Sequence, residues 1–210
     1  MSKQIYSISA RRMLWRFNVD VVAYVHPAWL KSWPVRASSK LHSQTLIAQL
    51  ELGLVDASLM TSKHGRLMLL DACDLKKLAR LGAALGAAER LKLLILGKEV
   101  RACVRVLGRE TVDMALQLES NALVQPFKRL TFNDSVISLP RHLLEVQRGL
   151  LRALCDSVPN AAAQRMRLRF RPGYFDRIGV IGNDAALVAA LLDAAPYANL
   201  SEQAKCTLQY

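Results

Sequence analysis

Basic side chains recur at regular intervals in two parts of the sequence, and each run could bind an anionic group. In the first run, Lys and Arg recur three or four residues apart, which is the spacing of one face of a helix. In the second run, Arg occupies every other position, which is the spacing of one face of a strand. The first run is Lys98, Arg101, Arg105 and Arg109, and the second is Arg165, Arg167, Arg169 and Arg171.

The chemistry open to these eight residues is the binding of anionic groups. Guanidinium groups donate to carboxylates in a bidentate way, so either run could hold an acidic protein partner. Nucleic acid is a second possibility, because Lys and Arg release counterions from phosphates. A solvated cationic face without a partner is the third. The second run contains four arginines and no lysine, which slightly favours the acidic protein. All eight residues are therefore candidates for partner binding.

The usual sequence motifs of catalysis and cofactor binding are missing. The histidines, at positions 26, 42, 64 and 142, do not have metal-ligand spacing. The stretch Gly179–Gly182 lacks the G-x-G opening of a dinucleotide-binding turn. Acidic residues number 17 against 29 basic ones and are scattered, which disfavours acid–base chemistry. We therefore expect a non-enzymatic protein that uses no cofactor and no metal.

Composition narrows the class of protein further. Hydrophobic residues make up 52% of the 210 residues, which excludes a disordered basic tail despite the net charge of +12. No run of about 18 uncharged apolar residues occurs, so we expect no membrane-spanning helix. The first 20 residues contain Arg11, Arg12 and Arg16 without a continuous apolar stretch, so we do not expect a cleaved signal peptide.

The four cysteines point to a reducing compartment, the cytoplasm. They form no C-x-x-C pair, and three lie in apolar helical patterns, where a free Cys acts as a small hydrophobic residue. We expect core residues and not disulfides. The cysteines are Cys73, Cys103, Cys155 and Cys206.

Helical periodicity dominates the chain. Asp71 and Asp74 resemble a helix N-terminus, and Gly82, Gly86, Gly97 and Gly108 either end short helices or let neighbouring helices approach closely. The predicted helices cover 39–52, 74–85, 87–96, 98–107, 110–119, 140–156 and a last segment that Asn183 or Asp184 begins and Asp193 ends.

Two segments predict strands. Residues 17–25 are rich in β-branched side chains, although their alternation is imperfect. Residues 165–171 alternate strictly, which places four arginines on one face and three apolar side chains on the other. We therefore predict a mainly α fold with minor short strands, α+β in that limited sense.

Aromatic residues concentrate in the first 35 positions and predict a small aromatic-rich N-terminal lobe. We place this lobe at residues 1–65, with a flexible connection at 61–65, and a helical body with one basic strand at 66–210. A single compact multi-helix domain is the alternative. The tail from Pro196 is expected to be weakly ordered.

Three stretches of the sequence together form a recognisable order. The first is Arg16-Phe17 followed by residues 23–30, AYVHPAWL. The second is the leucine- and glycine-containing region 78–107, and the third is Leu168-Arg169-Phe170-Arg171-Pro172. These stretches resemble the K proteins of the bacterial type III secretion sorting platform, the SctK/YscK-like family.

The resemblance implies a mainly helical, cytoplasmic adaptor that is peripheral to the inner-membrane secretion apparatus. Such an adaptor has no enzymatic activity and no cofactor. It would link the cytoplasmic domain of the inner-membrane ring protein to the pod protein, and so to the ATPase complex. The resemblance transfers no individual contact residues, so the two basic runs are candidates on their residue types and spacing alone.

A rival function is a basic, helix-turn-helix-like DNA-binding regulator, with residues 74–107 supplying the motif. The near-continuous apolar stretch 91–96 indicates burial and leaves few positions free for base edges. We therefore favour the adaptor, and expect neither specific nucleic-acid binding nor direct membrane insertion.

Overall fold

The computed structural model describes residues 8–31, 39–94, 97–119, 121–130, 138–176 and 185–209. Helices dominate these ranges, and no strand occurs within them. The α-helices are α1 (Ile8–Val19), α2 (Ser39–Gln49), α3 (Lys63–Arg66), α4 (Ala72–Gly86), α5 (Ala88–Leu93), α6 (Gly97–Leu107), α7 (Arg109–Leu118), α8 (Leu139–Asp156), α9 (Asn160–Arg167), α10 (Ala185–Asp193) and α11 (Glu202–Gln209). The short 3-10 helices are η1 (Val21–Ala23), η2 (Pro27–Trp29), η3 (Ala57–Thr61), η4 (Leu67–Leu69), η5 (Ala122–Arg129) and η6 (Ala195–Tyr197).

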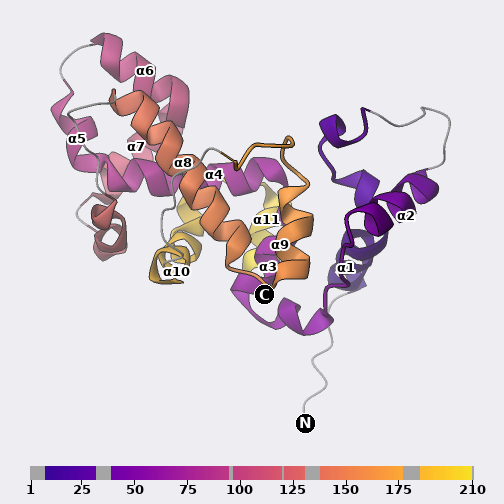
Figure 1. The fold of residues 1–210 in the computed structure, drawn as a ribbon. Helices are drawn as coiled ribbons and strands as arrows, with labels where there is room; N and C mark the ends of the chain where they lie inside the picture. The colour runs from indigo at the N-terminus through magenta and orange to yellow at the C-terminus, as the bar shows by residue number, and fades with distance from the viewer. Residues whose placement is uncertain are drawn as a thin grey trace.

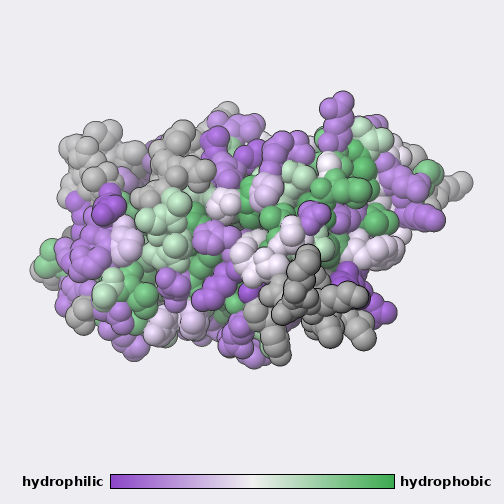
Figure 2. Space-filling view, turned by 90° about the horizontal axis from the view of Figure 1, so that it is seen from below, coloured by the Kyte–Doolittle hydropathy of each residue, from purple (hydrophilic) through white to green (hydrophobic). Residues whose placement is uncertain are grey.

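The helices are arranged along one direction (Figure 1). Helices α5, α6 and α7 lie at one end, α4 and α8 cross in the middle, and α1 and α2 lie at the other end. Hydrophobic and hydrophilic residues are interspersed over the face seen from below (Figure 2). Any docking surface must therefore be identified from local geometry.

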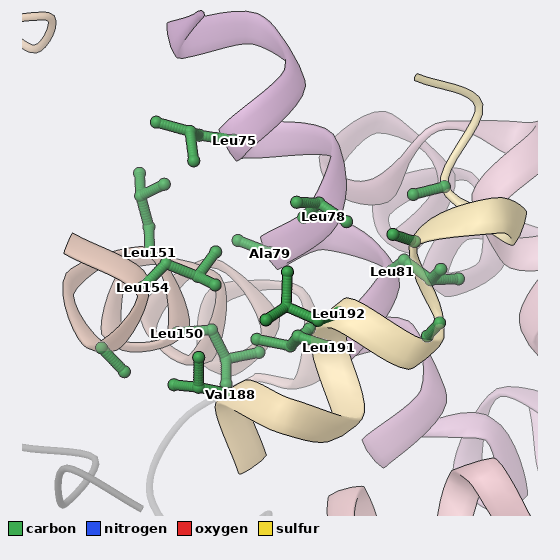
Figure 3. Packing of buried hydrophobic residues seen from close by; sticks show 14 of the residues in the cluster. Leu75, Leu78, Ala79, Leu81, Leu150, Leu151, Leu154, Val188, Leu191 and Leu192 are labelled. Carbon is green, nitrogen blue, oxygen red and sulfur yellow. The ribbon is translucent and has the colours of Figure 1, made fainter. Parts of the chain in front are cut away.

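The core of the molecule is built where α4 packs on α8 and α10 (Figure 3). Gly82 makes this close approach possible, because a Cβ there would lie 2.5 Å from Leu191 Cδ2 and 2.9 Å from Leu150 Cδ1. Glycine inside α4 thus serves helix packing and does not end the helix. The leucine, valine and alanine side chains that meet in Figure 3 are Leu75, Leu78, Ala79, Leu81, Leu150, Leu151, Leu154, Val188, Leu191 and Leu192.

The mainly α fold class is confirmed, and the predicted helices of the middle region form. The side chain of Asp71 accepts a hydrogen bond from the Asp74 amide at 2.8 Å and caps α4. Pro140 occupies the first turn of α8, where its missing N–H has no cost. Asn183 and Asp184 lie outside the described residues, and α10 ends at Asp193 as predicted.

The predicted strand at 17–25 is wrong. This segment contains the end of α1 and the turn η1. Val21 and Val25 lie four residues apart, the Val25 amide donates to the Val21 carbonyl at 3.0 Å, and both side chains are buried. Helical spacing therefore buries the β-branched residues from which we predicted a strand.

The predicted strand at 165–171 is also wrong. Residues up to Arg167 belong to α9, and Leu168–Phe170 continue as a turn. The alanines at 161–163, which favour helix, lie directly before this segment. In a helical arrangement Arg165 and Arg169 share one side, and both are buried. The four arginines therefore do not form one exposed face.

The predicted N-terminal lobe with an aromatic core is not supported. Trp15 is 60% exposed, and Phe17 packs into the main core of the molecule. The small second cluster is aliphatic, and Leu168 from the body is part of it; it comprises Val21, Val25, Leu46, Leu52 and Leu168. Tyr6 and Trp33 lie outside the described residues. The division at residue 65 stays a prediction, although the proposed flexible connection at 61–65 includes much of α3.

The tail from Pro196 is ordered by contacts with the start of α4, contrary to expectation. Asp74 is buried and accepts hydrogen bonds from the Ser201 amide at 3.0 Å and the Ser201 hydroxyl at 2.6 Å. Ala204 and Leu208 of α11 are buried against the body. The Asp74 carboxylate in the first turn of α4 thus fixes the tail to the body.

Two of the four cysteines should react quickly with a thiol reagent in the folded protein. Cys73 and Cys206 are exposed, whereas Cys103 and Cys155 are buried. Burial raises the pKa of Cys155 to about 12 and also raises the pKa of Cys103. We expect two thiols to react at pH 8 and four after denaturation, as measured by the absorbance of the released chromophore.

The raised pKa values of Cys103 and Cys155 predict that the free energy of unfolding falls at alkaline pH. The pKa of a thiol in the unfolded chain is about 8.5. The buried thiols therefore contribute stability fully below that pH, and the contribution falls as the pH rises towards 12. In the thiol-reagent experiment, fast reaction of three or four thiols in the native protein would contradict the burial of Cys103 and Cys155.

A candidate partner-binding groove

A groove of about 760 Å³ lies between α5, α6 and α7. Helices α6 and α7 contribute apolar side chains to its walls at helical spacing, and Leu91 of α5 and Leu94 just beyond that helix complete them. Three arginines and one aspartate line it as well. The lining residues are Leu91, Leu94, Val100, Arg101, Cys103, Val104, Arg105, Arg109, Val112, Asp113 and Leu116.

Buried residues of α6 and α7 hold the walls in place. Cys103 and Leu107 of α6 are almost fully buried, and α6 packs against α8. Ala115 of α7 is fully buried, and α7 packs against α4. Gly108 alone joins α6 to α7, with a φ of 86° that other residue types rarely adopt. The groove is therefore built on packed helices and a fixed turn.

The groove carries more positive than negative charge. Arg101 and Arg105 are exposed on α6, and the Arg105 Nε donates to the Arg101 carbonyl at 3.4 Å. Arg109 Nε lies 3.7 Å from Asp113 Oδ2, and both side chains are largely exposed. Such an exposed pair is weak. Three guanidinium groups thus face one carboxylate in an otherwise apolar groove.

The first basic run is only partly gathered at this site. Arg101, Arg105 and Arg109 line the groove, whereas exposed Lys98 does not belong to its lining. Val100 and Val104 of α6 lie in the same groove as the arginines. The run is also divided, because Arg109 begins α7.

Arg165 of the second run lies inside the molecule. Its side chain is 0% exposed, and it donates to three backbone carbonyls and one hydroxyl from the N-terminal part of the chain. The acceptors are Gly53 O at 3.1 Å, Phe17 O at 3.0 Å, Leu52 O at 3.4 Å and Tyr24 Oη at 3.3 Å. One guanidinium group thus fastens three separate segments together.

Arg169 lies beside this network and is 8% exposed. Its Nη2 donates to the Met68 carbonyl at 2.7 Å, and its Cζ lies 5.2 Å and 5.3 Å from the ring centroids of Phe17 and Tyr24. Its Nε and Nη1 are buried without a hydrogen-bond partner. Burial lowers the pKa of Arg169 to about 10.

The other two arginines of the second run are more accessible. Arg167 pairs with Asp156, which also lies 3.5 Å from Arg152 Nε. Arg171 is exposed. Arg165 and Arg169 bind groups within the chain, so they are not available to a partner. Arg101, Arg105 and Arg109 in the groove therefore remain the main candidates for partner binding.

The sequence analysis missed the apolar half of the groove. Leu91 and Leu94 are spaced by three, and Val112 and Leu116 by four, which is the pattern of one helix face. This spacing can be read from the sequence. The sequence does not show the turn at Gly108, which brings the faces of α6 and α7 to the same groove.

Comparisons with known proteins give no relative from which to assign a function. No protein-family model matches the chain, and searches of curated proteins and of solved structures found no significant match. Among the described residues, no three His, Cys, Asp or Glu side chains are grouped so that they could hold a metal ion. None of the helices in the described ranges combines the length and apolarity needed to cross a membrane.

Proposed function

We propose that the chain is a non-enzymatic docking adaptor whose groove binds an acidic amphipathic helix of a partner protein. The observation that carries this proposal is the combination of apolar walls from three helices with Arg101, Arg105 and Arg109 in one groove. Apolar anchors of a partner helix would enter the groove, as in other helix-in-groove complexes. Carboxylates three or four residues apart on that helix would meet Arg101 and Arg105, which share the same spacing.

The chemistry of the groove supports a protein partner over a small metabolite. Its positive groups are arginines, and the two on α6 are exposed, which suits rim contacts that steer association. Its volume of about 760 Å³ accommodates several apolar side chains. The resemblance to type III secretion K proteins gives this adaptor a place. We propose the cytoplasmic domain of the inner-membrane ring protein and the pod protein as its two partners, with the ATPase complex beyond, and the cytoplasmic side of the inner membrane as its location.

Charge reversal at the groove tests the docking function. We expect the double variant Arg101→Glu/Arg105→Glu to bind a labelled helical peptide, with leucines on one face flanked by glutamates, at least about tenfold more weakly, or about 1.4 kcal/mol. Both arginines are exposed, so the fold should persist. Fluorescence anisotropy at 50 and 150 mM salt gives the affinities, and circular dichroism checks the fold.

The matched controls are the variant Lys98→Glu and a second peptide in which lysines replace the glutamates. Lys98 lies on α6 outside the groove, so the same charge reversal there should change peptide affinity little. Equal weakening by Lys98→Glu and by Arg101→Glu alone would reduce the effect to net charge and remove the groove from the proposal. Tight binding of the lysine-substituted peptide would do the same.

Co-purification from the native host tests the proposed partners. With nuclease present, the wild-type chain should recover the ring protein and the pod protein, and the double variant should lose at least one of them. Recovery of neither partner by the wild-type chain would contradict the place in the secretion apparatus while leaving the peptide result to judge the groove.

DNA binding through residues 74–107, which cover most of α4 and all of α5 and α6, is the rival function. Ala87 alone joins α4 to α5, so this pair of helices lacks the three- or four-residue turn of a helix-turn-helix motif. Sequence-preferring duplex binding with a steep salt dependence would nevertheless overturn the adaptor proposal.

A further inference from the structure

The buried guanidinium of Arg169 is only partly compensated, by one hydrogen bond to the Met68 carbonyl and by the rings of Phe17 and Tyr24. Its Nε and Nη1 have no hydrogen-bond partner, and the carboxylates of the described ranges form no ion pair with it. The charge of Asp71 acts on it only as a minor influence beside burial. Unpaired buried charges are strongly unfavourable, because the lost hydration is not replaced. A negative charge bound next to Arg169 would therefore stabilise its charged form.

A small pocket of about 120 Å³ lies directly beside this group. Arg169 forms part of its wall, together with Arg16 of α1 and Gln203 of α11. Arg16 is exposed and forms no ion pair within the described part of the chain. Tyr24, Phe17 and Leu69 are among the remaining lining residues. Two arginines and a side-chain amide from three distant segments thus converge on one space.

The size of the pocket limits what it could hold. A water molecule occupies about 30 Å³ in the liquid, so the pocket has room for about four. Sites for nucleotides and other drug-sized ligands are usually about 300 Å³ or larger. A tetrahedral oxyanion fits this size and accepts several hydrogen bonds at once, which matches the donors of Arg16, Arg169 and Gln203.

We propose that this pocket binds a small oxyanion of the size of phosphate. The bound anion would compensate the charge of Arg169 and bridge α1, the turn after α9, and α11. It would thereby strengthen the attachment of the N-terminal segment to the body. The phosphate group could come from free inorganic phosphate or from a phosphorylated serine side chain, which the test distinguishes.

Thermal unfolding in increasing phosphate, at constant ionic strength balanced with chloride, tests the site. A ligand that binds the folded state raises Tm with a saturable dependence on its concentration. We expect such a rise for the wild-type chain and for Arg12→Gln. Arg12 is exposed on the same helix and lies outside the pocket lining, so this variant loses the same charge without losing the site. Arg16→Gln should weaken phosphate binding at least about tenfold.

The controls separate specific binding from general salt effects. Phosphate also stabilises proteins by exclusion from their surface, and this contribution grows without saturating in all variants. Phosphorus NMR titration measures the affinity directly and at one temperature. Equal saturable binding by Arg16→Gln and Arg12→Gln, or no saturable binding by the wild-type chain, would overturn the proposal.

Titration with O-phosphoserine identifies the source of the anion. Binding of O-phosphoserine as tightly as inorganic phosphate would assign the pocket to a phosphorylated side chain. Selective binding of inorganic phosphate would assign it to the free ion. Either result is independent of the groove between α5, α6 and α7, because the pocket shares no residue with it.

Discussion

Replacing Arg165 with methionine is expected to lower the free energy of unfolding by more than about 3 kcal/mol. The substitution keeps an unbranched side chain but removes every donor of the guanidinium group. The carbonyls of Phe17, Leu52 and Gly53 then each lose a hydrogen bond, although Phe17 O keeps the one from the Tyr24 hydroxyl at 2.8 Å. Each of the three lost bonds comes from a charged donor and is worth about 1.5–3 kcal/mol. Because these acceptors are backbone groups, an apolar replacement cannot remove them together with the charge.

Urea unfolding measures this loss, with Arg171→Met as the matched control. Arg171 is exposed in the same basic run, so its replacement should change stability by less than about 0.5 kcal/mol. Arg165→Lys should fall between the two, because a lysine keeps the charge but lacks the planar fork. A midpoint for Arg165→Met equal to that of Arg171→Met would show that the buried network contributes little.

Replacing Gly65 with alanine is expected to lower the free energy of unfolding by about 3 kcal/mol. A Cβ at this position would lie 1.7 Å from the carbonyl oxygen of Leu59, a backbone atom that no rotamer change can move. The turn between η3 and α3 must then open. Leu67 and Met68, which follow at once and are fully buried, would shift with it. This cost lies at the upper end of the usual range for overpacking.

Gly97→Ala provides the comparison for Gly65→Ala. At Gly97 the nearest atom to an added Cβ is Arg101 Nη1, at 3.4 Å and at the end of a flexible side chain. Alanine favours helix over glycine by up to about 1 kcal/mol, so stability should be unchanged or slightly higher. Differential scanning calorimetry of both variants gives the result, and similar Tm values would contradict the close approach at Gly65.

Local signals predicted the helical middle of the molecule well. The cap at Asp71, the proline at position 140 and the leucines three and four residues apart act within single helices, and each helix formed. The strand prediction from the alternating arginines was wrong because the alternation spans only seven residues and does not exclude a helix. Helical spacing brings Arg165 and Arg169 to one side, where carbonyls more than 90 residues away accept their hydrogen bonds. No local pattern contains that information.

The candidate groove was half predicted for the same reason. The sequence indicated arginines on one helix face, and three of the four line the groove. The apolar walls come from α5 and α7 as well as α6, so they depend on how three helices pack. The turn at Gly108 determines this packing, and a glycine in the sequence does not state the φ that it adopts.

The long reach of Arg165 also sets an order of events during synthesis. The carbonyls of Leu52 and Gly53 precede it by 113 and 112 residues. At about 5–20 residues per second, a ribosome needs roughly 6–22 seconds to polymerise that length. Throughout this interval Arg165 has not yet been synthesised, so the carbonyls of the N-terminal segment lack their donor. The cluster of Val21, Val25, Leu46 and Leu52 also lacks Leu168, its fifth member. The amino-terminal part of the chain is thus the first to be translated and among the last to dock, and it is the part that a chaperone on the nascent chain would meet exposed.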